Sequence, residues 1–529
     1  MRRIELADAG FLYMEKRQTP MHVGGLHLFT LPDGADGPEF LNDLMAVLRT
    51  EEPYRKPFGE YVRHGRAGAL GPLYWEKDRN FDMDYHVRHS ALPRPGRFRE
   101  LFMLVSRLHS MLLDRNRPLW EMYLIEGLQN RQFALYMKMH HAATDGAGAM
   151  HMINAMYATR KTDRTQRSPF SLAAYEEYKT RRRAARQARV VPKEAELRNV
   201  AEILREQFDT TANLMGAFRR FGSAFIGRGD GLAVPWHQVP HTSLNTQVTG
   251  SRRFVAQSWD FDRIRAVCKA ADGTVNDIVL AMCGGALRRY LLAQDELPKH
   301  SLKAMTPVSL REESDFDSSN AVGFMVADLA THIADPEGRL RRTQESMRAG
   351  KSLLQSLSRR EAMLFMQITQ VPALLTSLMG LATRFPAFST VISNVPGPQE
   401  QLYWNGARVD GMYPASIVFD GFAMNITLLS YNKQLHFGIV ACRRSLPHVQ
   451  RVIDYLEEAL QELEDMVGIR PGGGAAKATN TKTAKAKTTK AKTPRTKAPK
   501  AKVTKARTTT GGGRKTAPSS KARPKGSKG

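Results

Sequence analysis

The chain alternates short strand-like apolar segments with longer segments of helical spacing, and this alternation occurs in two successive stretches. In the first stretch, strands are expected at His22–Thr30, Trp120–Glu126 and 133–139, and helices at 101–113 and 147–158. The pattern predicts an α/β fold, and 529 residues are too many for one ordinary core. We therefore expect an N-terminal domain over 1–160 and a C-terminal domain over 251–468.

The second stretch shows the same alternation. Strands are expected near 253–258, 416–419, 423–431 and 435–441, and helices at Val275–Leu292 and 446–466. A further helix ends near Ala271, and either Asp260 or Asp262 is suited to cap its first turn. The apolar segment 362–381 is interrupted by glutamines and a proline; core helices are favoured there over an interfacial helix.

Residues 161–250 have a different composition and predict a crossover between the two domains. Residues 160–189 are crowded with Lys and Arg, two helical patterns follow at 194–207 and 211–225, and 227–250 is rich in Gly, Pro, Ser and Thr. The basic segments 160–189 and 218–228 are suited to attract anionic headgroups.

The C-terminal tail, 469–529, repeats Lys, Ala, Thr and Pro and has almost no large apolar residue, which predicts disorder. Residues 471–529 carry 18 Lys and Arg and no acidic residue, so 26 − 18 leaves +8 on the first 470 residues. The extreme charge therefore belongs to the tail. The regular spacing of these positive charges is suited to binding anionic lipid or, without base specificity, nucleic acid.

Three cysteines without a CxxC pair argue against a disulfide framework and a zinc site. Acidic residues interrupt the N-terminus where a signal peptide needs an apolar core, and no apolar run reaches the roughly 18–20 residues that span a bilayer. We therefore expect a cytoplasmic protein whose contact with an inner membrane or lipid inclusion is peripheral.

The run HHAATDG at 140–146 is the strongest chemical signal. A neutral imidazole accepts a hydroxyl proton near neutral pH, and an apolar strand ending at Met139 provides a rigid mount. Adjacent strand residues point to opposite sides, so one of His140 and His141 faces the reaction and the other faces the packing. Asp145–Gly146 is expected to form a turn, and Asp145 is expected to brace the loop through an arginine from elsewhere in the fold.

Each feature also has a structural reading. A histidine pair is often ordinary surface or core, and a metal site that includes His151 is disfavoured because adjacent histidines rarely bind one ion. Pro118 and Trp120 fit packing as well as substrate binding. Asn276 and Asp277 most simply cap the helix that follows, and Asn394 with Gly397 most simply forms a rigid turn.

Taken together, these motifs resemble the bacterial wax ester synthase/diacylglycerol acyltransferases, within the HHxxxDG superfamily of coenzyme A-dependent acyltransferases. The resemblance rests on HHAATDG and on several companion segments that occur in order across residues 1–468. These companions are MEKRQTPMHVGGL at 14–26, RPLWEMYLIEG at 117–127, TVNDIVLAMCGGALRRYL at 274–291, PVSLR at 307–311, SSNAVGF at 318–324 and SNVPGP at 393–398.

The resemblance implies two chloramphenicol acetyltransferase-like domains with mixed sheets flanked by helices, joined by the long crossover, and a tunnel between them. It implies that His141 is the general base and that His140, Asp145 and Gly146 hold the motif. It also links the segment of Asn276 to activity. Pro118, Trp120 and Asn394 are candidate substrate-binding residues, and Arg311 is a candidate partner for Asp145.

The implied activity is transfer of a long acyl chain from acyl-CoA to diacylglycerol or a fatty alcohol, giving triacylglycerol or wax ester. Acyl-CoA would be a substrate, and no metal or other cofactor is expected. Two alternatives stay open. One is a nucleic-acid or polyanion-binding protein that acts through the basic tail, and the other is a condensation-type acyltransferase that uses a carrier-bound acyl group.

Overall fold

The computed structural model describes residues 1–469 except for some short segments. The segments that it leaves out are residues 51–52, 66–67, 69–70, 145, 165–166, 188–199, 230 and 310–321. Residues 1–471 form one compact unit. The expected disorder of the tail concerns residues that lie outside the described part of the chain.

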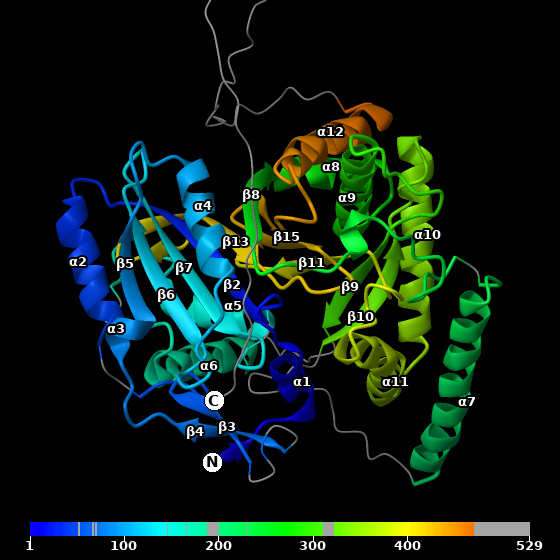
Figure 1. Cartoon of the computed structure of the whole chain (residues 1–529), viewed down its shortest axis with the longest axis horizontal. Coiled ribbons are helices and arrows are strands. Elements are labelled where there is room, and N and C mark those ends of the chain that lie inside the picture. The colour runs from blue at the N-terminus through cyan, green and yellow to red at the C-terminus, as the bar shows by residue number, and fades with distance from the viewer. Residues whose placement is uncertain are drawn as a thin grey trace, which may run out of the picture. The chain divides into compact units, whose positions relative to one another are not determined.

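The first six-stranded sheet is built mainly from the N-terminal stretch (Figure 1). Its strand order is β12 (Tyr403–Trp404), β13 (Ala407–Ala415), β2 (His22–Thr30), β7 (Gln132–His140), β6 (Trp120–Glu126) and β5 (Val87–Ala91). Only the β5–β6 pair is parallel. Residues 133–140 of β7 are all buried, which explains its continuous apolar run. The expected strands at 22–30 and 120–126 are confirmed, and the third extends one residue further at each end.

Helices and a small sheet surround this first sheet. The helices are α1 (Leu6–Met14), α2 (Gly37–Leu48), α3 (Met83–His86), α4 (Phe98–His109) and α5 (Gly146–Met156), and the small sheet contains β1 (Arg2–Arg3), β4 (Leu73–Lys77) and β3 (Glu60–His64). Helix α4 begins and ends earlier than the expected 101–113. Glu100 caps its start by accepting from the Arg97 amide, and after its end the buried Lys138 ammonium donates to the Met111 carbonyl at 2.9 Å.

The second sheet has the order β10 (Val322–Asp328), β9 (Lys303–Ser309), β11 (Thr390–Pro396), β14 (Met424–Tyr431), β15 (Gln434–Cys442) and β8 (Arg252–Asp260). Strand β11 runs parallel to both neighbours, and the other pairs are antiparallel. Its helices are α8 (Phe261–Ala270), α9 (Val275–Leu292), α10 (Pro336–Gln355), α11 (Arg359–Leu378) and α12 (Arg451–Met466). Asp260 caps α8, and α9 has the expected bounds.

Strands β12 and β13 differ from the expected division of the chain. They belong to the stretch 251–468, yet β13 pairs with β2 in the first sheet. The expected strand at 416–419 is also wrong, because the strand ends at Ala415. Gly411, Pro414 and a register shift after Val409 interrupt the alternation in β13, which hid it from the sequence pattern. Strands β12 and β13, which come from the C-terminal part of the chain, therefore belong to the first sheet and connect the two parts.

The crossover contains two long helices, α6 (Leu172–Gln187) and α7 (Val200–Phe225). The two helices expected at 194–207 and 211–225 are one continuous helix from Val200 onward, and residues before it lie in an undescribed segment. Ala217 of α7 packs in an apolar cluster with Phe365 of α11. Within the described residues, no helix is long and apolar enough to cross a membrane.

Candidate active site

A cavity of about 1700 Å³ receives walls from both sheets. The first sheet contributes residues of β2, β7 and β13, and the second contributes residues of β11 and β14. Helices α1, α5 and α11 and the loops 382–388 and 416–422 are among the other segments that line it. The cavity therefore lies where the N-terminal and C-terminal parts of the chain meet.

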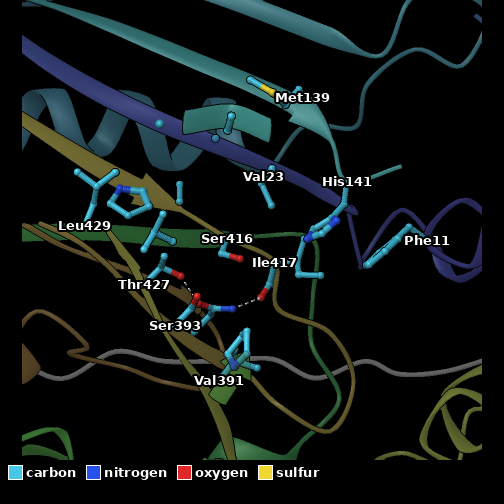
Figure 2. A pocket seen from close by; sticks show the side chains of 18 of the residues that line it. Phe11, Val23, Met139, His141, Val391, Ser393, Ser416, Ile417, Thr427 and Leu429 are labelled. Carbon is cyan, nitrogen blue, oxygen red and sulfur yellow. Dashed lines mark hydrogen bonds between the residues drawn. The ribbon is translucent and has the colours of Figure 1, made fainter. Parts of the chain in front are cut away.

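His141 lies on the wall of this cavity, directly after β7. Its ring stacks on Phe11 of α1 with 4.2 Å between centroids and an angle of 13° between the planes. Its backbone amide donates to the Met21 carbonyl at 2.9 Å. Figure 2 shows the ring between Phe11 and the segment Ser416–Ile417. An imidazole held by stacking and by its backbone keeps a defined direction into the cavity.

His140 is the last residue of β7 and is completely buried. Its Nε2 atom lies 3.5 Å from Oε1 of Glu15, and its Nδ1 atom accepts from the Ala142 amide at 3.1 Å. The structure thus places the two histidines as the strand geometry predicted: one in the packing and one at the cavity.

Glu15 connects several parts of this arrangement. It accepts from the Met21 amide at 3.0 Å and from the Arg115 guanidinium at 3.1 Å. Burial raises the pKa of Glu15, but the hydrogen bond and charge of His140, the Met21 amide and Arg115 together lower it below its usual value. Because Met21 also holds the His141 amide, Glu15 braces both histidines. Sequence reasoning missed this role, although Glu15 lies in the segment that carried the resemblance.

The remainder of the HHxxxDG motif is only partly described. Gly146 is the first residue of α5, so the motif ends where this helix begins. Asp145 and its suggested partner Arg311 both lie in segments that the structure does not describe. The predicted bracing of the loop by an arginine therefore stays a prediction.

Pro118 and Trp120 lie in the core. Trp120 has no exposed surface, its Nε1 atom donates to the Phe58 carbonyl at 2.8 Å, and its ring packs on Phe170. Pro118 is also buried, and its carbonyl accepts from the Trp120 amide. Neither is among the described residues that line the cavity. Their burial fits the packing reading, and substrate contact by either residue stays a prediction.

The start of α9 is capped by Asp277, as expected, but its partner is Thr274 and not Asn276. Thr274 is the N-cap, and Asp277 returns the bond by accepting from the Thr274 amide at 2.9 Å. Asn276 lies between them without a capping role, and it too is absent from the described lining of the cavity. Its position therefore adds no support for the expected catalytic role.

Asn394 does line the cavity, but within strand β11 rather than in the expected turn. Gly397 follows this strand, where a Cβ atom would lie 2.4 Å from the Ser430 carbonyl, so only glycine fits. Ser393, Asn425 and Thr427 lie on the same wall. Thr427 donates to the Asn425 side-chain oxygen at 2.8 Å, and the Asn425 amide donates to the Ile417 carbonyl at 3.1 Å (Figure 2). This wall orders the loop that faces His141.

His27 is a second imidazole on the cavity wall that the sequence did not single out. It is fully buried and shares a hydrogen bond of 2.5 Å with the Tyr157 hydroxyl. Burial lowers its pKa to about 3. The described residues contain no group of three His, Cys, Asp or Glu side chains arranged to hold a metal ion, His151 included.

Comparison with known families assigns the chain. The catalytic-domain model of the wax ester synthase/diacylglycerol acyltransferases matches residues 4–279, and the C-terminal-domain model of the same family matches 318–464. The chain belongs to the wax ester synthase/diacylglycerol acyltransferase family. It is therefore an acyltransferase, and the expected family is confirmed.

Two relatives of this wax ester synthase/diacylglycerol acyltransferase are similar in sequence over most of its length. The O-acyltransferase WSD of Acinetobacter baylyi is 39% identical over 485 residues, which are 92% of this chain and 100% of that protein. A putative diacylglycerol O-acyltransferase of Mycobacterium tuberculosis is 44% identical over 464 residues, covering 87% of this chain and 99% of the relative.

Solved structures confirm the mixed α/β architecture. The wax ester synthase/diacylglycerol acyltransferase from Marinobacter aquaeolei VT8 matches with a TM-score of 0.70 and 39% identity, over 88% of this chain and 100% of that chain. The first condensation domain of the CDA synthetase matches with a TM-score of 0.53 at 13% identity, over 88% and 97% of the two chains. The second likeness concerns the fold alone.

Proposed function

We propose that this acyltransferase moves a long acyl chain from acyl-CoA to the hydroxyl group of diacylglycerol or a fatty alcohol, with His141 as the general base. The observation that carries the proposal is the place of the His141 imidazole, on the wall of one large cavity formed by both sheets. An ester-forming enzyme needs a base at a point that both the acyl donor and the alcohol reach.

The character of the cavity supports long, flexible substrates. Many of its lining side chains are apolar, and eight of them are methionines: Met14, Met137, Met139, Met150, Met152, Met156, Met305 and Met412. Methionine is unbranched and polarisable, so a methionine-rich wall adapts to chains of different shape. This lining favours acyl chains and lipid alcohols over small polar acceptors.

The proposed reaction needs one base and no covalent enzyme intermediate. His141 takes the proton of the substrate hydroxyl while its oxygen attacks the thioester carbon. Collapse of the tetrahedral intermediate breaks the carbon–sulfur bond, and the imidazolium returns the proton to the departing coenzyme A thiolate. The products are an ester and free coenzyme A.

The cysteines support direct transfer. None of Cys268, Cys283 and Cys442 is among the described residues that line the cavity. Burial raises the pKa of Cys268 to about 11 and raises that of Cys283 as well, so both stay protonated at neutral pH. Burial acts the same way on Cys442, but hydrogen bonds from Ser445 and Thr249 lower its pKa to about 7.

We also propose that the enzyme works at the cytoplasmic surface of a membrane or lipid inclusion, where its water-insoluble acceptors reside. The 18 Lys and Arg of residues 471–529 support an additional, non-specific attraction of the tail to anionic lipid or nucleic acid. This attraction would be added to the transferase activity and would not replace it, because the family models match residues 4–279 and 318–464, outside the tail.

The direct test uses labelled palmitoyl-CoA with either hexadecanol or dioleoylglycerol. We expect ester and free thiol to appear in equal amounts with at least one acceptor, and the faster acceptor identifies the preferred product. Thiol release without ester would indicate hydrolysis. Absence of both esters would contradict the proposed substrates.

A further inference from the structure

One face of helix α11 is apolar and exposed. Leu364, Ile368, Leu375 and Met379, the last at the C-cap, are 44%, 47%, 48% and 62% exposed. Pro372 is also exposed and lies between Ile368 and Leu375. In chain order the five residues are separated by four, four, three and four positions, which places them along one side of the helix. We call Leu364, Ile368, Pro372, Leu375 and Met379 the apolar stripe.

The other sides of α11 are already occupied. Phe365 and Met366 are buried in the cluster with α7, and Thr376 and Ser377 line the cavity. The Thr376 hydroxyl donates to the Ala373 carbonyl of its own helix at 3.0 Å. A surface helix normally turns polar residues outward and apolar residues inward. Helix α11 does the reverse along the apolar stripe, which indicates an apolar partner outside the described residues.

The exposed charged residues that border the apolar stripe along the sequence are arginines. Between Glu361, which is buried, and Glu400, the only charged residue is Arg384. Arg384 is exposed, and its guanidinium lies 5.7 Å from the centre of the Phe385 ring. Arg360, also exposed, precedes Leu364 by one helical turn. Apolar residues between two arginines match a layer of hydrocarbon beneath anionic headgroups.

The cavity opens beside this stripe. Leu6 of α1 and Phe385 both line the cavity, and they are 84% and 52% exposed. Helix α1 lies against α11, and Figure 1 shows the two helices near each other at the junction of the sheets. The cavity wall therefore reaches the molecular surface at two apolar side chains, one on α1 and one in the loop that follows α11.

We propose that the apolar stripe docks the enzyme on the surface of an anionic phospholipid bilayer, with the cavity mouth turned toward the lipid. A lipid alcohol then enters past Leu6 and Phe385 without crossing water. The inference rests on the proposed function for the identity of the acceptor, whereas the docking itself rests on the apolar stripe and the arginines that border it.

Flotation of the full chain with phosphatidylcholine/phosphatidylglycerol vesicles tests the docking. The stripe variant carries Ile368→Gln, Leu375→Gln and Met379→Gln. The matched control carries Met103→Gln, Met111→Gln and Leu112→Gln, which are also exposed apolar residues, on helix α4 and directly after it. Salt at about 0.5 M screens the basic tail, so that the remaining binding reports apolar contact.

We expect the stripe variant to bind these vesicles at least about tenfold more weakly than the wild type and the control. Its rate with a detergent-dispersed acceptor should stay unchanged, while its rate with a vesicle-embedded acceptor falls. Equal vesicle binding by all three proteins would overturn the proposal. A change in oligomeric state instead of vesicle binding would also overturn it, in favour of a second copy of the chain. Vesicle binding by a wild type without transferase activity would contradict only the proposed function.

Discussion

His140 and His141 are neighbours in the chain with different surroundings. His140 is enclosed next to Glu15, whereas His141 stacks on Phe11 at the cavity. The division follows from strand geometry, because successive side chains leave a strand on opposite sides. A buried acidic partner fixes the first ring and, through Met21, the backbone of the second. The geometry of the pair thus depends on residues far from it in sequence.

Glu15→Gln tests this bracing. The neutral amide removes the charge that Arg115 and His140 face, so we expect the free energy of unfolding to fall by about 1–3 kcal/mol and the transfer rate to fall with it. Urea denaturation and ester formation measure the two effects.

Glu177→Gln is the matched control, because it removes a carboxylate that pairs with Arg167 at the surface. An exposed pair of this kind contributes about 0–1 kcal/mol. Equal stability and activity of Glu15→Gln and Glu177→Gln would show that Glu15 does not brace the histidines.

Several buried histidines predict acid sensitivity. Burial lowers the pKa of His27 and of His109 to about 3 and that of His436 to about 4. An unfolded histidine titrates near 6.5, so between that pH and the folded pKa the unfolded state binds more protons. Stability is therefore complete above about pH 6.5 and falls as the pH decreases, by about 2 kcal/mol per such group at about pH 5.

His27→Gln isolates one of these groups. Glutamine offers the Tyr157 hydroxyl a hydrogen-bond partner but does not titrate in this range. Urea denaturation across pH 5–7.5 should show a shallower loss of stability for this variant than for the wild type. An identical pH dependence of the two proteins would mean that the pKa of His27 in the folded state is close to its unfolded value of about 6.5.

At the scale of elements, the junction of the two sheets depends on a close approach of β13 and β15. A Cβ atom at Gly438 of β15 would lie 1.7 Å from the Pro414 carbonyl of β13, so any side chain there collides with backbone. Strand β13 is also the element that the sequence pattern missed. The fold is thus held together by a contact that no local periodicity reveals.

Gly438→Ala should therefore separate the sheets locally and lower the free energy of unfolding by about 1–3 kcal/mol, with loss of activity. Gly222→Ala in α7 is the control, because nothing lies within 4 Å of its added methyl group and alanine favours a helix. Thermal unfolding of both variants measures the effect. A neutral Gly438→Ala would contradict the tight junction.

Helices and strands whose apolar residues recur with a clear period were predictable from the sequence, and elements without such a period were not. The bounds of β2, β6 and α9 follow from apolar spacing alone, and the motifs placed His141 correctly at a strand end. The exchange of β13, the core position of Trp120 and the cap at Thr274 depend on long-range pairing and local hydrogen bonds. Glu15 was missed because its partners His140 and Arg115 are separated from it by about a hundred residues or more.

At the scale of the whole molecule, the catalytic family match ends before the basic tail. Residues 1–471 form a compact unit, and most of the charge belongs to 471–529. Removing residues 472–529 should leave the transfer rate with detergent-dispersed substrates unchanged and abolish most low-salt retention on DNA or heparin. Loss of activity on truncation would show that the tail takes part in catalysis.

The central claim is that His141 is the base of an acyl transfer. The most direct measurement is the rate of ester formation from labelled palmitoyl-CoA by the wild type and by His141→Ala, with His332→Ala, a surface histidine, as control. We predict a rate about 10²–10⁴-fold lower for His141→Ala and an unchanged rate for His332→Ala, with folding intact in both. A near-normal rate for His141→Ala would contradict the account.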